Sequence, residues 1–243
     1  MNHLPGKTEG PDEYDVEFEI EVSRSALGKH IPVRLNTIKL ALIAKNKQQS
    51  FEPWQLGLTL DLIESVERNC EELLLTIGKN RLSASAWNAR NLLELWVWTK
   101  FCGISRENAW RFHEDALRDL KDMVDAYKKG CDAMGIDDSY SGVATQRIKK
   151  VAQDHLRLED VNHMFLKATT ASEAPGVGLG AKFGPLNKML SKFAHPTAGH
   201  IHGIAHQVDQ SRQLQSVFTT QGVYFADQST LALEIQSGVH TRP

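Results

Sequence analysis

Residues 105–135 read SRENAWRFHEDALRDLKDMVDAYKKGCDAMG and carry the clearest structural signal in the chain. Eight side chains of this stretch recur at alternating steps of three and four: Trp110, His113, Leu117, Leu120, Val124, Tyr127, Cys131 and Met134. That spacing places them on one face of a helix, in the heptad-like pattern of a seam that packs against another helix. Ser105 is a favourable N-cap and Gly135 is a favourable helix stop. The stretch therefore predicts one long amphipathic helix.

The chain from about residue 36 onward follows helical patterns throughout. Further helices are expected at roughly 36–47, 54–78, 84–102, 142–169, 184–195 and 200–237. Because Gly103 ends the helix before Ser105, the two helices that flank this point should form a tight antiparallel pair. Residues 171–184 contain four glycines and a proline and predict a loop, whose spacing matches neither a P-loop nor a Rossmann turn. The predicted fold is therefore all-α, with one multi-helix bundle domain over 36–243.

The N-terminal part of the chain has a different pattern. Residues 15–22, DVEFEIEV, alternate strictly between apolar and acidic side chains, which is typical of a half-buried β-strand. Such a strand needs a partner, either residues 31–35 in a small hairpin or a strand from another subunit. We therefore expect residues 1–35 to form an arm with a short β-strand or hairpin, through which a homo-oligomer or a protein partner would assemble.

Composition narrows the possible environments. The 243 residues contain 28 Lys and Arg against 30 Asp and Glu, so the chain lacks the basic field of a non-specific nucleic-acid binder. Its apolar runs are far shorter than the roughly 18–20 residues that a membrane span needs. The three cysteines are widely spaced and form no CxxC pair. We expect reduced thiols, no membrane contact and a cytoplasmic location.

Two pairs of polar residues are candidate site residues. Arg90 and Glu94 lie four apart in the apolar helix WNARNLLELWVWTKFC, where they form either a partly buried ion pair or an intrahelical pair with one edge in water. Ser191 and His195 lie one turn apart before Pro196, which ends or kinks their helix. The negative end of a helix dipole favours protonated imidazole, so His195 is a candidate general acid or anion contact. The alternative is a solvated, Lys-rich face capped by a histidine.

Other histidines permit two further sites. On a helix, His202, His206 and Asp209 share a face and could supply three metal ligands. His200 and His202 would instead need an extended backbone, so two metal arrangements compete, and we expect neither a metal nor another cofactor. Arg106 and His113 lie on nearly the same helix face, with six residues between them. They approximate the R-x4–6-H spacing of HEPN ribonucleases, although a single histidine on an apolar stripe is usually a hydrogen-bonded core residue.

The run RNLLE at 90–94, followed by LSKFAHP at 190–196, resembles an uncharacterised bacterial family of helical-bundle proteins. That family pairs an R-x-x-x-E helix with a later S-x-x-x-H helix end, and the similarity covers roughly residues 54–205. It resembles the wider HEPN-like group, which includes metal-independent ribonucleases of toxin and phage-defence systems as well as non-catalytic bundles. The resemblance implies that the four motif residues face one another across the bundle. Glu107 departs from the HEPN pattern, where Asn, Asp or His usually follows the arginine.

These observations give two hypotheses of different classes. In the first, an internal polar pocket binds RNA or a nucleotide and cleaves a phosphodiester without metal. Arg90 would hold the anion, Glu94 would orient it, Ser191 would complete the pocket and His195 would transfer the proton. In the second, the chain is a non-catalytic binding or regulatory module whose polar pocket is structural. The sequence leaves open whether the protein is an enzyme.

Overall fold

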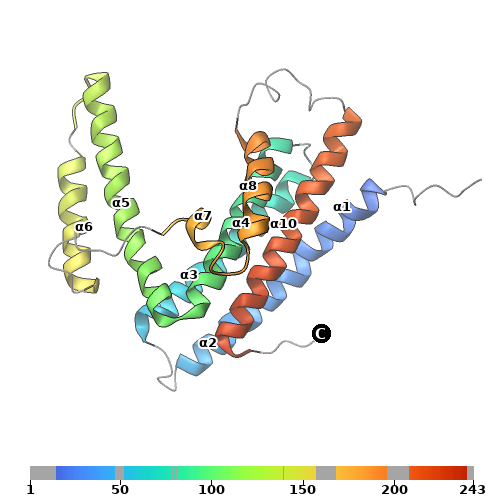
Figure 1. Cartoon of the computed structure of the whole chain (residues 1–243), viewed down its shortest axis with the longest axis horizontal. Coiled ribbons are helices and arrows are strands. Elements are labelled where there is room, and N and C mark those ends of the chain that lie inside the picture. Colours follow the sequence, from blue (N-terminus) through green and yellow to red (C-terminus); the bar gives the residue numbers. More distant parts are fainter. Residues whose placement is uncertain are drawn as a thin grey trace, which may run out of the picture.

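The computed structural model describes residues 15–46, 52–77, 79, 81–138, 140–156, 168–195 and 208–239. Within those ranges the chain forms helices and their connections and no strand, which confirms the all-α class. In chain order the elements are α1 (Val16–Ser25), the π-helical turn η1 (Ala26–His30), α2 (Ile31–Asn46), α3 (Pro53–Ile77), α4 (Leu82–Ile104), α5 (Arg106–Met134), α6 (Ser141–Leu156), α7 (Thr170–Glu173), α8 (Gly180–Ala194) and α10 (Val208–Ser237) (Figure 1).

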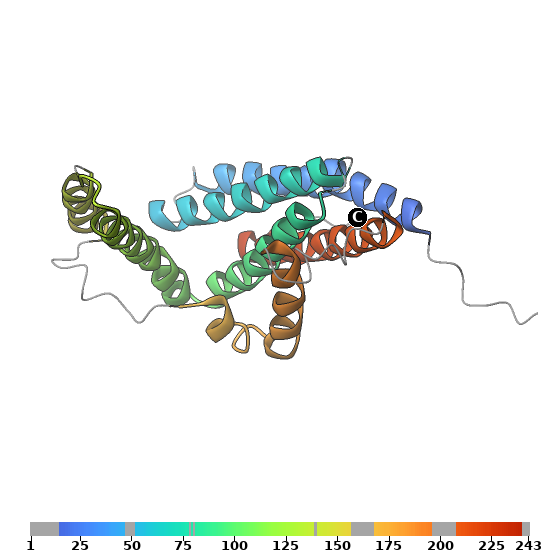
Figure 2. The same cartoon turned by 90° about the horizontal axis from the view of Figure 1, so that it is seen from above.

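The pair α4 and α10 forms the centre of the bundle, and α4 also packs against α3 and α8 (Figures 1 and 2). α4 contributes large buried side chains such as Leu92, Leu93 and Trp96. α10 contributes many small or polar buried residues: Ser211, Ser216, Thr219, Gly222, Ala226, Ser229 and Thr230. Several of their hydroxyls donate to carbonyl oxygens one turn earlier in α10. Because those groups are hydrogen-bonded within their own helix, they can be buried without a partner from another helix.

The β-strand expected over residues 15–22 is wrong, because these residues lie in α1. Asp15 is the N-cap, and its Oδ1 accepts from the backbone N–H groups of Glu17 (3.1 Å) and Phe18 (3.0 Å). Phe18 is 63% exposed and Val22 is 47% exposed, although the alternating pattern requires both to be buried. The buried residues recur instead at steps of three and four: Ile20, Ser23, Leu27, Ile31, Leu35, Ile38 and Leu42.

The π-helical turn η1 keeps this buried stripe facing the bundle. Between Ser23 and Leu35 the stripe advances by four residues three times in succession. In a regular α-helix such steps would carry it steadily around the axis, because one turn holds about 3.6 residues. The Ile31 N–H donates to the Ala26 carbonyl five residues earlier, which gives a locally wider turn. Residues 31–35, predicted as the partner strand, consequently continue the helix as the start of α2.

Two arginines fasten these N-terminal helices to α10. The Arg212 guanidinium makes two 2.8 Å hydrogen bonds to the Glu17 carboxylate of α1. Arg34 of α2 makes a similar pair of bonds to Glu234, at 2.8 and 3.0 Å, and a further bond to Asp227. Two-point contacts of this kind fix orientation as well as distance. Assembly of subunits through an N-terminal strand therefore has no structural basis in residues 15–22.

The helix α5 has the predicted bounds and caps, but a different partner. The Ser105 hydroxyl accepts from the Asn108 N–H at 3.1 Å, and Gly135 ends the helix with a φ of 65°. The single extended residue Ser105 joins α5 to α4, which continues through Gly103 to Ile104. This short connection directs α5 away from α4. The second half of α5 pairs with α6 in a projecting hairpin (Figures 1 and 2). The expected antiparallel contact of α4 and α5 therefore holds only over the first turns of α5, where the Phe112 ring lies 4.8 Å from the Trp98 ring, and the prediction of a tight pair along both helices is wrong.

The glycine-rich segment is more ordered than a loop. Thr169 caps α7 through a reciprocal arrangement with Ser172, so the helix expected over 142–169 does not include residues 168 and 169. After a turn, α8 begins at Gly180, four residues earlier than expected. Residues 200–207 of the last expected helix lie outside the described residues, and α10 follows them. Among the described helices, none is long and apolar enough to cross a membrane.

Gly222 provides a test of the central packing. A Cβ atom at this position would lie 2.3 Å from Cδ2 of the buried Leu73. We expect Gly222→Ala to lower the free energy of unfolding by about 1–2 kcal/mol, because the overpacking exceeds the gain in helix propensity. Urea denaturation measures the difference. Gly57→Ala is the matched control, since Gly57 lies inside α3 and a Cβ atom there would have no atom within 4 Å, so this change should leave stability unchanged or slightly raised. A Gly222→Ala protein as stable as that control would contradict the close packing.

Candidate functional site

Arg90 is held at the contact between α4 and α8. One terminal nitrogen of its guanidinium lies 2.6 Å from Oε1 of Glu94, and its Nε donates to Oδ1 of Asn187 at 2.8 Å. The guanidinium carbon also lies 6.0 Å from the centre of the Trp87 ring. Arg90 is therefore engaged by a carboxylate, an amide oxygen and an aromatic ring at once.

His195 lies near the same tryptophan, at the C-cap of α8. Its ring meets Trp87 edge to face, with 5.8 Å between centres, and its backbone N–H donates to the Ser191 carbonyl at 3.3 Å. Asn187, Ser191 and His195 follow one another at intervals of one turn. Arg90 and His195 thus each lie near Trp87, Glu94 pairs with Arg90, and Ser191 lies one turn before His195 on α8. We call this arrangement the α4–α8 seam.

The ion pair at this seam is neither fully buried nor fully hydrated. The side chains of Arg90 and Glu94 are 23% and 28% exposed, which lies between the two alternatives that the sequence left open. Burial raises the pKa of Glu94 above its ordinary value, even though the neighbouring Arg90 acts to lower it. The short contact alone would suggest a stabilised carboxylate. The effect of desolvation on the pKa is larger than that of Arg90, so folding disfavours the ionised form of Glu94 relative to the protonated form.

The alternative metal site receives no support from the described part of the chain. His202 and His206 lie outside the described residues, and Asp209 lies in the first turn of α10 without a described side chain. Elsewhere in the described ranges, no group of three or more His, Cys, Asp or Glu residues is arranged to hold a metal ion. Thiol chemistry is also disfavoured at two cysteines, because burial raises the pKa of Cys70 and of Cys102 to about 12.

A cleft lies where the start of α3 meets the base of the α5 and α6 hairpin. Its volume is about 1170 Å³, and residues of α3, α5 and α6 line it. Both secondary candidates from the sequence, Arg106 and His113, are among them. This structure therefore places that pair at one cavity, which we call the α3–α5 cleft.

Aromatic rings form one wall of the cleft. The rings of Trp54 and Trp110 meet edge to face with 4.9 Å between centres, and His113 lies 5.7 Å from Trp54 and 5.6 Å from Trp110. Hydrogen bonds fix both indoles: Trp54 Nε1 donates to Glu52 at 2.5 Å, and Trp110 Nε1 donates to Glu114 at 2.8 Å. The wall is therefore held in place by the protein itself.

Arg106 occupies the rim of the cleft. Its guanidinium lies 2.6 Å from Oε1 of Glu52 and 5.9 Å from the centre of the Trp54 ring. The hydrogen bond from Arg106, followed by that from Trp54, lowers the pKa of Glu52 below its ordinary value. Arg106 is thus neutralised by a carboxylate and stacked on an indole, which shows the kind of group that this ring accepts.

The remaining charges of the cleft are negative. Asp61 from α3 and Asp154 from α6 both line it, and neither has an ion-pair partner among the described residues. Because Glu52 and Arg106 neutralise each other, these two exposed carboxylates set the sign of the local potential. A phosphate-bearing ligand would be repelled there, whereas a cation would be attracted. Sequence reasoning missed Trp54, Asp61 and Asp154, since they come from elements distant in the chain from Arg106.

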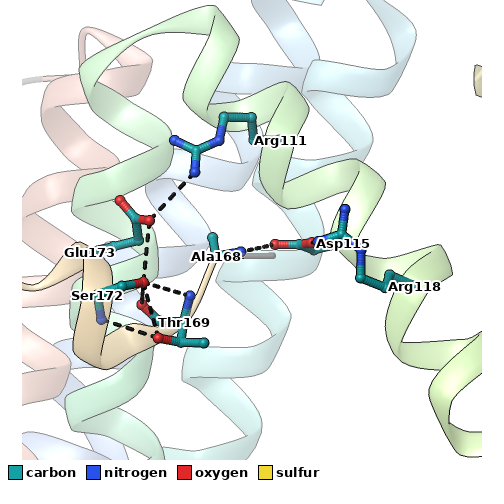
Figure 3. A network of polar contacts seen from close by, with 7 residues as sticks. All are labelled: Arg111, Asp115, Arg118, Ala168, Thr169, Ser172 and Glu173. Carbon is teal, nitrogen blue, oxygen red and sulfur yellow. Dashed lines mark hydrogen bonds and ion pairs between the residues drawn. The ribbon is translucent and has the colours of Figure 1, made fainter. Parts of the chain in front are cut away.

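A polar network joins the first half of α5 to α7 and the residues before it (Figure 3). Asp115, which is buried in α5, accepts from the Ala168 N–H at 2.8 Å and also pairs with Arg118. One turn earlier, Arg111 lies 3.5 Å from Glu173 of α7. The chain that returns from the hairpin is thereby tied to the base of α5. This attachment fixes the direction in which the hairpin leaves the bundle.

Comparisons with known proteins give no relative: no family model, no curated protein and no solved structure matches the chain.

The pKa of Glu94 provides a test of the seam. A carboxyl with a raised folded-state pKa favours folding while it is protonated, and this contribution is lost as the pH rises from the ordinary Glu value of about 4.3 through the raised value. We therefore expect wild-type protein to lose stability relative to Glu94→Gln between acid and neutral pH. Urea denaturation at a series of pH values measures the difference. Glu72→Gln, at an exposed carboxyl of α3, is the matched control, and a wild type that gains stability relative to Glu94→Gln with rising pH would contradict the account.

Proposed function

We propose that the chain is a non-catalytic binding module whose ligand site is the α3–α5 cleft and whose ligand is an organic cation. The single observation that carries this proposal is the combination of an aromatic wall with two carboxylates that have no ion-pair partner in the described part of the chain. Indole rings attract cations through their negative faces, and nearby carboxylates add a longer-ranged attraction.

The form of the cleft supports a ligand with an apolar body and a charged end. Leu58, Ala116, Leu117 and Val151 provide apolar lining beside the tryptophans. The volume of about 1170 Å³ is slightly larger than the range of roughly 300–1000 Å³ for small-molecule sites, so it also admits a long side chain of a peptide. Alkylammonium and alkylguanidinium groups combine an apolar stem with a positive head. A lysine or arginine side chain of a partner and a free amine share this chemistry.

Calorimetric titration with tetramethylammonium and with butylguanidinium tests the proposal. Both cations should bind, and both should shift the indole N–H resonances of Trp54 and Trp110, whereas butyrate and AMP should not. The double variant Asp61→Asn, Asp154→Asn should weaken the binding of cations by about tenfold, because it removes the attraction of both carboxylates. Added salt should weaken binding to the wild type more than to this variant.

Glu72→Gln is the matched control for that titration, since Glu72 is an exposed carboxylate of the same helix α3 and does not line the cleft. It should bind both cations as the wild type does. Binding of AMP rather than the cations would contradict the assignment. Equal affinity of the double Asn variant and the control would contradict it as well.

A second candidate function is metal-independent RNA cleavage at the α4–α8 seam. The observation that favours it is that the Arg90 guanidinium and the His195 ring both lie within 6.0 Å of the centre of the Trp87 ring. Aromatic rings beside cations are a common surface for bases and phosphates of single-stranded RNA. The geometry supports this function less than the first, because Glu94 and Asn187 already engage Arg90.

Labelled RNA incubated with purified protein in excess EDTA tests this second function. Cleavage by wild-type protein should be lost in His195→Ala, since His195 is the group that would transfer the proton. The matched control is His30→Ala, because His30 is another exposed histidine, located in η1. Absence of cleavage by the wild type, or cleavage that persists in His195→Ala, would remove this function.

A further inference from the structure

The outer part of the α5 and α6 hairpin has very little core of its own. Among the described residues beyond the cleft, its buried apolar cluster consists of Val124, Ala144 and Ile148, with Cys131 buried farther along α5, and this cluster is separate from the main core of the bundle. Two helices joined by so small a core gain little from burial, and most helical stability comes from packing. An additional covering surface would therefore stabilise the hairpin considerably.

The same hairpin exposes a large apolar surface. Of the nineteen large hydrophobic side chains that are exposed in the described part of the chain, eight fall between residues 120 and 151. Their concentration in one projecting hairpin distinguishes them from the single apolar residues that are normal on any protein surface. Their exposure ranges from 40% at Val151 to 67% at Met134.

These side chains follow a helical seam. On α5 one stripe recurs at alternating steps of four and three: the exposed Ala116, Leu120, Met123 and Tyr127, the half-buried Gly130, and the exposed Met134. This stripe runs beside the buried stripe of Leu117, Val124 and Cys131 that faces the hairpin core. The alternation is the pattern of a helix that packs against a second helix on that side as well. Gly130 faces open space, which allows a partner helix to approach closely.

The exposed stripe continues from α5 onto α6. The rings of Tyr127 and Tyr140 meet edge to face with 5.7 Å between centres and join the two helices at the surface. On α6, Val143, Arg147 and Val151 follow at steps of four. We call this joint surface of both helices the hairpin face, made up of Leu120, Met123, Tyr127, Met134, Tyr140, Val143 and Val151.

The charges of the hairpin indicate what covers this face. The outer part of α5, residues 119–134, contains four aspartates against three lysines, a net charge of −1, whereas α6 contains one arginine and two lysines against one aspartate, a net charge of +2. A twofold axis would place α5 of one copy against α6 of the other, and also the reverse. Both contacts then join opposite charges, so the surface is complementary to itself.

We propose that the hairpin face is the interface of a homodimer, in which the hairpins of two copies of this chain pack into a four-helix bundle. The apolar stripe provides the buried seam, and the opposite net charges of α5 and α6 set the antiparallel orientation. The inference is independent of the ligand in the α3–α5 cleft, because most of the hairpin face lies beyond the residues that line the cleft.

Light scattering after gel filtration, together with sedimentation velocity over a wide range of protein concentration, tests the interface. The wild type should be a dimer. The double variant Met123→Glu, Val143→Glu should raise the dissociation constant at least about tenfold, because it places two charges in the apolar seam of each copy. Both positions are exposed and lie outside the cleft, so the circular dichroism spectrum should remain that of the wild type. Arg147→Glu, a single exposed charge reversal on α6, should also weaken the dimer.

The matched control is Leu75→Glu, since Leu75 is 65% exposed on α3, away from the hairpin, and its replacement should leave a dimer. A wild type that is monomeric at every concentration would overturn the proposal. So would a double Glu variant that associates as strongly as Leu75→Glu, or a larger assembly that the double Glu variant does not dissolve.

Discussion

The close contact between α4 and α10 is the constraint on which the rest of the structure depends. α10 can approach α4 and α3 because it presents small residues, with Gly222 opposite Leu73, Ala89 and Leu92. Two buried polar side chains of these helices make hydrogen bonds to α3: Gln215 of α10 donates to the Thr76 carbonyl at 2.8 Å, and the Ser85 hydroxyl of α4 donates to Thr76 Oγ1 at 2.8 Å. The interface is thus tight and hydrogen-bonded at once, which specifies a single register of the two helices.

The positions of the two candidate sites follow from this central pair. α4 packs against α10 on one side and α8 on another, so the polar groups Arg90 and Glu94 lie at the edge of the core rather than within it. At its C-terminal end, α4 passes directly into α5, and the one-residue connection sends the hairpin away from the bundle. The hairpin and α3 meet at an angle that can be followed in Figure 2, and the α3–α5 cleft lies where they meet. The same angle leaves the hairpin face exposed.

Much of this fold could be predicted from the sequence, because its signals are local. The bounds of α5 follow from a capping serine and a C-terminal glycine, and both act within one turn. The prediction for the N-terminal region was wrong because its eight alternating residues also fit a strand. The buried helical stripe becomes clear only when it is followed as far as Leu42 and when a π-helical turn is included in it. The partner of α5 could not be predicted, since a helix with apolar stripes on two neighbouring sides does not reveal which helix packs on which.

The candidate sites also combine residues that the sequence could identify with residues that it could not. Arg106 and His113 share one helix, so their spacing alone predicts that they lie on one face of it. The wall and charges that give the cleft its chemistry come from α3 and α6, where Trp54, Asp61 and Asp154 form no recognisable motif. At the seam, the sequence identified Arg90, Glu94 and His195 but not the tryptophan that lies near both Arg90 and His195, because Trp87 is one of several aromatic residues of α4. Which residues share a face of one helix can be predicted from their spacing in the sequence. Which residues of separate helices come together can be seen only in the folded structure.

Amide hydrogen exchange of the full chain in dilute solution tests the central claim most directly. If the contact between α4 and α10 is the stable centre and the hairpin depends on further cover, amides of α4 and α10 should exchange most slowly. Those of α6 and of α5 beyond Leu117 should exchange much faster, because they can open without disturbing the core. Hairpin amides as slow as those of α4 and α10 in dilute solution would contradict this account.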